Sequence, residues 1–235
     1  MLAGFFNYDN PVWRFIGKFF DIMILNLLWV VCSIPIVTMG ASTTAVYYVT
    51  MKLVRDEDSS TIRSFFKSFK ENFRQATIIW LILLAAGCLI GFDLYFFMRV
   101  RTDASMFRTV MLAVFLGFAL IWLCITLFVF PLQAKFYNPV RRTIFNAFFM
   151  SIRHFLHSLG MIAVDVLMVA LALFVPWLMA VMTLFGFPLF AFVNSCVFVS
   201  VFDKYIPKQE EEQRTDGDVW ELPEDAGKTL AKKDE

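Results

Sequence analysis

Charged residues are almost absent from five long stretches of this 235-residue chain. The stretches are centred near Leu27, Leu83, Leu120, Val169 and Val197, and each approaches or exceeds the roughly twenty apolar residues that cross about 30 Å of hydrocarbon as a helix. With 59% hydrophobic residues and 29 phenylalanines, the chain would expose too much apolar surface in water. The sequence therefore excludes a soluble globular protein and predicts an all-α, polytopic transmembrane helical bundle.

The chain also lacks the motifs of several enzyme classes. It has no H-E-x-x-H zinc motif, no G-x-S-x-G nucleophile elbow and no phosphate-binding P-loop. Its four cysteines are isolated, without the spacing of metal ligands or of a redox pair. His154 and His157 are three residues apart, but no third ligand is near them in the sequence. We expect a protein that is not an enzyme and that has no cofactor, no bound metal and no nucleic-acid partner.

The two ends of the chain differ from its apolar body. Tyr8, Asp9 and Trp13 precede the first apolar run and no small-residue cleavage site follows it, so we expect this span to be retained rather than cleaved as a signal peptide. Residues 203–235 contain eleven acids and six bases, and too few apolar residues to fold alone. We expect a transmembrane helical domain over residues 1–205 and an acidic, largely disordered cytoplasmic tail over residues 206–235.

Proline and glycine divide the apolar runs into predicted helices. A first span ends near Pro35, and the break between Pro35 and Gly40 precedes a second helix, because proline removes a backbone donor and glycine permits a turn. The last two spans are expected to meet in a tight turn near Gly186 and Pro188. The six predicted helices cover about residues 15–35, 41–54, 77–98, 110–131, 159–181 and 184–202.

The second helix decides whether there are five spans or six. Its residues rise only about 21 Å, which is short for a full crossing. If it crosses, both termini are inside and 18 of the 21 Lys and Arg residues lie on the cytoplasmic side, which favours such residues. If it does not, only Arg14 and Lys18 change sides. We favour six spans in the plasma membrane, with a cytoplasmic C-terminus, because this pair closely flanks the first span.

The basic segment between the second and third spans has a helical period. Ile62, Phe65, Phe66, Phe69 and Phe73 recur at three- and four-residue steps, with bases at the intervening positions. This pattern predicts an amphipathic helix that lies at the bilayer surface. The helix either anchors the fold on the bilayer or docks a cytoplasmic partner.

A second basic segment, at about residues 133–158, resembles the first in plan. Phe66, Phe69 and Arg74 recur there as Phe145, Phe148 and Arg153, which indicates a weak parallel repeat of the kind found in transporter folds. The two segments predict a pair of basic interfacial helices. Their candidate surface for lipid or a partner comprises Arg63, Lys67, Lys70, Arg74, Arg141, Arg142 and Arg153.

A few polar residues lie inside the predicted spans. Asp165 is the strongest candidate for function, because it lies roughly 9 Å into the fifth span, where ionisable groups are costly. The alternative is a structural carboxylate bonded to a neighbouring helix. Asp93, near the outer end of the third span, pairs with Arg99 or Arg101 in the simplest interpretation. The candidate intramembrane polar site comprises Asp165, Asp93, Asp21, Asn26, Ser42 and Thr43.

Two small motifs have more than one interpretation. Ser42 and Thr43 belong to a cluster of hydroxyl residues around the Pro35 to Gly40 break, where free backbone N–H groups could bind an anion. The same hydroxyls could instead cap the helix. Gly87 and Gly91 have GxxxG spacing, which permits close approach either of a helix of the same bundle or of a second copy in a homodimer.

Three stretches resemble the YesL-like family of bacterial integral membrane proteins. They are SIPIVTMGASTTA at residues 33–45, KLVRD at residues 52–56 and FFKSFKENFRQA at residues 65–76, and the resemblance covers most of residues 1–205. It implies a domain of unknown function whose members are often encoded beside carbohydrate importers of the ABC type. We therefore expect an accessory protein of carbohydrate uptake, with the lipid bilayer and importer subunits as partners. The alternative is a small-solute transporter with a site between its helices.

Overall fold

The computed structural model describes residues 11–57, 60–99 and 105–205, and every element in them is a helix. The predicted acidic tail, residues 206–235, lies outside the described residues, so the proposed domain boundary stays a prediction. In chain order the elements are α1 Pro11–Ser33, the short 3-10 helix η1 Ile36–Thr38, α2 Met39–Val54, α3 Thr61–Arg99, α4 Ser105–Lys135, α5 Val140–Arg153, α6 Phe155–Phe174 and α7 Pro176–Phe202. The predicted all-α class is confirmed.

Five helical stretches are long and apolar enough to cross a membrane. Few of their side chains are fully buried, since at most 39% of the apolar window of any of them is buried, and many point outward. The outward side chains are mainly Leu, Ile, Val and Phe, which is the arrangement expected where lipid replaces water as the solvent. The stretches are Ile16–Ser33, Thr61–Arg99, Met106–Lys135, Phe155–Phe174 and Trp177–Phe202.

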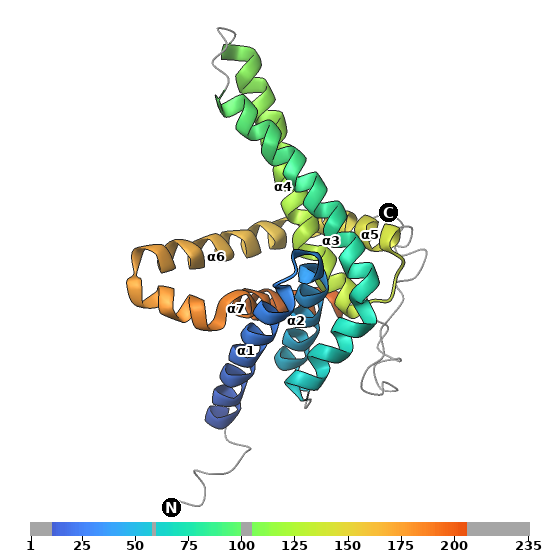
Figure 1. Ribbon diagram of the computed structural model, residues 1–235, viewed down its shortest axis with the longest axis vertical. Helices are drawn as coiled ribbons and strands as arrows, with labels where there is room; N and C mark the ends of the chain where they lie inside the picture. Colours follow the sequence, from blue (N-terminus) through green and yellow to red (C-terminus); the bar gives the residue numbers. More distant parts are fainter. Residues whose placement is uncertain (1–10, 58–59, 100–104, 206–235) are drawn as a thin grey trace, which may run out of the picture.

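Helix α2 lies among the other helices and packs against α1, α3, α4 and α7 (Figure 1). Every residue from Gly40 to Lys52 is buried. Its 16 residues rise about 24 Å, which is less than the hydrocarbon thickness. Because protein surrounds it, α2 tolerates hydroxyl residues that find partners inside; Thr50, for example, lies 2.8 Å from the hydroxyl of Ser195 on α7.

Two long helical hairpins, α3 with α4 and α6 with α7, extend in different directions from this centre (Figure 1). In the first hairpin, Gly87 provides the close contact: a Cβ there would lie 2.7 Å from the Trp122 ring. The Trp122 indole also donates a hydrogen bond of 2.9 Å to the carbonyl of Leu83. Gly87 thus serves packing within the chain, whereas a Cβ on Gly91 would have no neighbour within 4 Å.

The first predicted interfacial helix is not a separate element. Residues 61–99 form the single helix α3 of 39 residues, roughly 58 Å long, so the basic segment and the third span are continuous. No proline or glycine interrupts the chain between them, and both parts have the same helical period. The second basic segment differs, because α5 ends at Arg153 and His154, with φ −106° and ψ 35°, separates it from α6.

The turn between the last two spans was predicted in the wrong place. Helix α6 ends at Phe174, and the chain turns at Val175, whose extended conformation is typical of a residue before proline. Pro176 then opens α7, where its missing N–H is harmless. Gly186, with φ 45° and ψ −142°, instead produces a kink within α7.

Candidate functional site

Residues of α1, α2, α3, α4, α6 and α7 line a partly open cavity of about 430 Å³. Its volume falls within the range of small-molecule sites. The aromatic part of the wall consists of Trp29, Tyr47, Trp80, Phe130, Phe187 and Phe190. The polar part consists of Thr43, Thr126, Asp165 and Asn194, so among the described lining residues there is one carboxylate and no Lys, Arg or His. We call this space the central cavity.

Asp165 and Asn194 form the polar centre of the cavity wall. The Asn194 side-chain amide on α7 donates a hydrogen bond of 3.0 Å to Oδ2 of Asp165 on α6. Asn194 is 2% exposed. Within the part of the chain that the structure describes, Asp165 Oδ1 and Asn194 Oδ1 are buried and accept no hydrogen bond. Two unsatisfied acceptors side by side are unusual in a folded protein and indicate a place for an external donor.

Aromatic contacts fix the opposite part of the wall. The Trp29 indole donates to Oγ1 of Thr43 at 3.3 Å and stacks on Phe187, with ring centroids 5.1 Å apart. Tyr47 meets Phe187 edge to face at 5.9 Å. The Trp80 indole donates a hydrogen bond of 2.8 Å to the carbonyl of Ile36. These contacts join the short helix η1 and α2 to α1, α3 and α7, and so hold the rings in place.

The structure thus brings two predicted site residues, Asp165 and Thr43, to one cavity. Met39, at the predicted break before α2, lines it as well. Asn194, Trp29 and Trp80 were missed by the sequence reasoning. A polar residue inside the apolar stretch 184–202 is the signal that could have singled out Asn194, whereas a tryptophan in an apolar run carries no such signal.

Asn26 has a structural role outside the cavity lining. Its side-chain amide donates to the carbonyls of Thr183 and Leu184, at 3.0 Å and 2.9 Å, immediately before the α7 kink. A Cβ on Gly186 would lie 2.2 Å from Asn26 Oδ1. Asn26 therefore holds the interrupted helix.

The other predicted polar residues also have local roles. Ser42 donates to the carbonyl of Thr38, one turn back in the chain, so its hydroxyl does not cap α2. Asp21 accepts a hydrogen bond from the Thr61 hydroxyl and thereby joins α1 to the start of α3. Asp93 is half-buried near the C-terminal end of α3. Arg99 lies over the Tyr95 ring at 5.6 Å, and Arg101 is outside the described residues.

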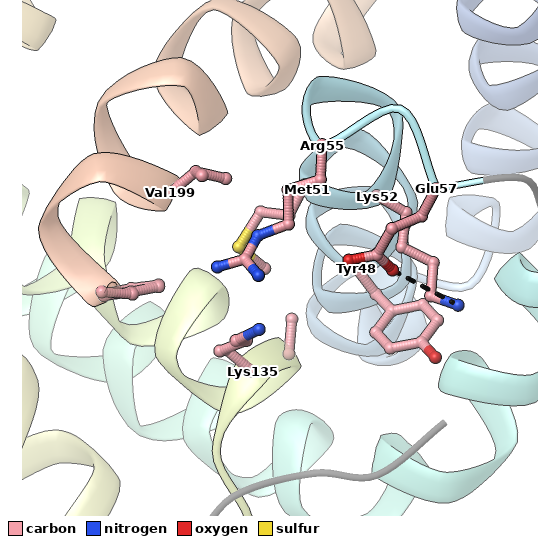
Figure 2. A pocket seen from close by; sticks show the side chains of 9 residues that line it. Tyr48, Met51, Lys52, Arg55, Glu57, Lys135 and Val199 are labelled. Carbon is pink, nitrogen blue, oxygen red and sulfur yellow. Dashed lines mark ion pairs between the residues drawn. The ribbon is translucent and has the colours of Figure 1, made fainter. Parts of the chain in front are cut away.

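A cluster of charged residues lies at the ends of α2, α4 and α7 (Figure 2). It surrounds a space of only about 20 Å³, enough for a water molecule. Lys52 lies 3.8 Å from Glu57 and also stands over the Tyr48 ring, while Arg55 pairs with Asp203 beyond α7. The Arg55–Asp203 pair joins the ends of α2 and α7, and the cluster offers little room for a ligand.

The predicted basic surface is mostly exposed. Arg63, Lys67, Lys70 and Arg74 are exposed on α3, and Phe66 and Phe73 on the same helix are 47% and 39% exposed. On α5, Arg141 and Arg153 are exposed and Arg142 is half-buried. The paired positions of the proposed repeat have matching exposure: Phe66 and Phe145 are exposed, Phe69 and Phe148 half-buried, Arg74 and Arg153 exposed.

The two basic segments meet through a buried amide network. Gln133 on α4 donates to Asn72 and Gln75 on α3, at 3.1 Å and 2.7 Å. It accepts a hydrogen bond of 3.1 Å from Thr143 on α5. Gln133 is 1% exposed, so this network fixes the positions of α3, α4 and α5 relative to one another.

His154, at the junction of α5 and α6, contacts the end of α7. Its Nε2 lies 3.0 Å from the Tyr205 hydroxyl, and its ring meets the His157 ring at 5.6 Å. Burial, together with the nearby charges of His157, Lys204 and Arg153, lowers the pKa of His154. Within the described residues, no group of three or more His, Cys, Asp or Glu side chains is arranged to hold a metal ion.

The long apolar helices define a multi-pass helical membrane protein. Residues 22–94, which extend from α1 to near the C-terminal end of α3, match a family described as proteins of unknown function, DUF624. The chain is 29% identical over 131 residues to the uncharacterized protein YesL of Bacillus subtilis (strain 168), a match that spans 54% of this chain and 60% of YesL. The expected resemblance to the YesL-like family is confirmed. No solved structure matches the chain.

Proposed function

We propose that this chain is a multi-pass membrane protein without enzymatic activity that binds a small solute in the central cavity. The observation that carries the proposal is the pair of unsatisfied acceptors on Asp165 and Asn194 in the wall of a ligand-sized space. Polar groups at membrane depth are costly and are usually retained for a function. The kinked α7 adds support, since interrupted helices often form solute sites in transporters.

Thermal unfolding of the purified protein in lipid nanodiscs tests this function. The probes are maltose, tetraphenylphosphonium and tetraphenylborate, which are neutral, cationic and anionic. A solute that binds the folded state raises the unfolding midpoint. Val166→Trp fills the cavity from a residue that lines it and is 62% exposed, and should abolish the rise. Leu167→Trp, at a 57% exposed neighbour outside the lining, should preserve it. Absence of any rise, or an equal rise in Val166→Trp, contradicts the proposal.

The proposed topology has six spans, with both termini in the cytoplasm and the protein in the bacterial plasma membrane. Helix α2 would be the sixth span, enclosed by protein and therefore able to cross with 16 residues. The distribution of Lys and Arg supports this orientation. Cysteine substitutions read by a membrane-impermeant maleimide provide the test. Ser105→Cys should react from outside, and Asn7→Cys only after the membrane is opened. Labelling of Asn7→Cys from outside contradicts six spans.

A role as an accessory to ABC-type carbohydrate importers is the second candidate function. The resemblance to the YesL-like family and the exposed bases of α3 support it. Affinity purification from cells should recover importer subunits, and the recovery should fall when Lys67, Lys70 and Arg74 are changed to Gln. Changing Arg99 and Arg108, at the other end of the α3–α4 hairpin, is the matched control and should have no effect. Unchanged recovery with the α3 variant contradicts docking through this surface.

A further inference from the structure

We propose that the central cavity selects lipophilic organic cations and that Asp165 supplies the counter-charge. The inference rests on the proposed solute-binding function and specifies its ligand class. Three features of the wall lead to it: the balance of charge, the balance of hydrogen-bond donors and acceptors, and the aromatic composition.

The charge of the wall is one-sided. Asp165 is the one carboxylate among the described lining residues, and no basic side chain from these residues lines the cavity. Asn194 gives the carboxylate a hydrogen bond but no compensating charge. An unpaired charge in an apolar environment is costly, so a cation that enters the cavity gains an interaction that an anion or a neutral solute lacks.

Three hydrogen-bond donors of the wall are engaged with the protein itself, and a fourth, the Tyr47 hydroxyl, interacts with the side chain of Asn194. The indoles of Trp29 and Trp80 donate to Thr43 and to the carbonyl of Ile36. The Thr126 hydroxyl donates to the carbonyl of Trp122. The buried wall atoms without a partner, on Asp165 and Asn194, are both acceptors. An anion requires donors and a sugar requires donors and acceptors together, whereas a cation requires only acceptors or negative charge.

The aromatic side chains suit the same ligand class. Six aromatic rings line the cavity. The face of an aromatic ring carries partial negative charge and attracts cations, most strongly where water is excluded. Trp29 is held by its hydrogen bond to Thr43 and its stacking on Phe187, so little side-chain freedom is lost when a ligand contacts it. A carboxylate beside several rings provides both long-range attraction and close apolar contact.

Tetraphenylphosphonium and tetraphenylborate have nearly the same size and opposite charge, so they isolate the effect of charge. Binding to the chain in phosphatidylcholine nanodiscs is measured by equilibrium dialysis, with empty nanodiscs as the correction for partition into lipid. We expect saturable binding of tetraphenylphosphonium, and of the smaller benzyltrimethylammonium, and no saturable binding of tetraphenylborate. Equal binding of the two tetraphenyl ions, or a preference for the borate, overturns the inference. This comparison needs only the unmodified protein.

Asp165→Asn should weaken tetraphenylphosphonium binding at least about tenfold, which corresponds to 1.4 kcal/mol. Asp165→Glu, which keeps the charge, should retain most of the affinity. Asp93→Asn, which removes a carboxylate of α3 outside the cavity, should leave the affinity unchanged. Unchanged affinity in Asp165→Asn overturns the inference. If maltose raises the unfolding midpoint and neither cation binds, the cation inference fails while the solute-binding function survives; if no probe acts, both fail.

Discussion

The amide of Asn26 donates a hydrogen bond of 2.9 Å to the carbonyl of Leu184, although 158 positions separate the two residues. In a regular helix this carbonyl would accept from the N–H of residue 188, but Pro188 has none. Asn26 therefore replaces a backbone donor that the sequence of α7 cannot provide. The same amide donates a second hydrogen bond to the carbonyl of Thr183, one residue before Leu184.

Replacing Asn26 by Leu should destabilise the folded protein. Both carbonyls would lose their donor in part-buried, apolar surroundings, where an unsatisfied polar group costs up to about 1–3 kcal/mol. The expected result is a lower thermal unfolding midpoint in detergent. Leu27→Ala is the matched control, since Leu27 is 66% exposed and neighbours Asn26 on the same helix. Equal midpoints for Asn26→Leu and the unmodified protein would refute a role of Asn26 at the kink.

Gly186→Ala should also be destabilising, for two separate reasons. The positive φ of 45° is unfavourable for an L-residue, with a cost of about 1–3 kcal/mol, and the new Cβ would collide with the Asn26 side chain. Shortening that side chain in the double variant Asn26→Ser with Gly186→Ala removes the collision but not the backbone strain. Gly117→Ala, where nothing lies within 4 Å, should be neutral. A destabilised Gly117→Ala with an unaffected Gly186→Ala would contradict the observed kink.

The two glycines of the GxxxG motif should respond differently to enlargement. Gly87→Val places carbon against Trp122 and should separate α3 from α4, which lowers the unfolding midpoint of the monomer. Gly91→Val meets nothing in the chain and should leave that midpoint unchanged. If a homodimer forms through this face, Gly91→Val should weaken it instead, as measured by cross-linking in membranes. Equal destabilisation by both substitutions would argue against the contact at Gly87.

Acidification should weaken the junction of α5, α6 and the end of α7. Burial lowers the pKa of His154 below its usual value of about 6.5, so the unfolded chain binds the proton more readily than the folded one. The stability contributed by neutral His154 is fully present above about pH 6.5 and is lost as the pH falls from there to the lower pKa of the folded state.

Proton NMR of the imidazoles measures this directly, since the chain has two histidines. In His157→Gln the single remaining signal belongs to His154 and should titrate below pH 6.5. His154→Gln should reduce the loss of thermal stability between pH 7 and pH 5. Titration of His154 above pH 6.5 would contradict the predicted direction.

The membrane character of the chain was predictable because lipid imposes its requirement on composition, and composition is visible in the sequence. Asp165 was identifiable for the same reason, since a carboxylate among apolar residues is conspicuous. The start of α2 was predicted at residue 41, two residues from its observed start at Met39. These features depend on local sequence alone.

The predictions from sequence were wrong or incomplete where a distant residue decides the local structure. Gly186 and Pro188 are a strong local signal for a turn, yet the chain continues as α7 because Asn26 bonds the freed carbonyls. The length of α3 could not be derived from its pattern, since a surface helix and a span share the same period. The wall of the central cavity combines residues from six helices, and Asn194 becomes significant only when α7 brings it to Asp165.

The enclosure of α2 has a consequence for biogenesis. A ribosome delivers α2 to the membrane long before α7, and until then Thr50 lacks Ser195, its partner 145 positions later. During that interval the helix would face lipid or the membrane insertion machinery, and its hydroxyls would have only backbone carbonyls of the same helix as partners. The last helix to be made thus completes the burial of the second. A chain that stalls before α7 would offer quality-control proteases an unfinished centre rather than a smaller working protein.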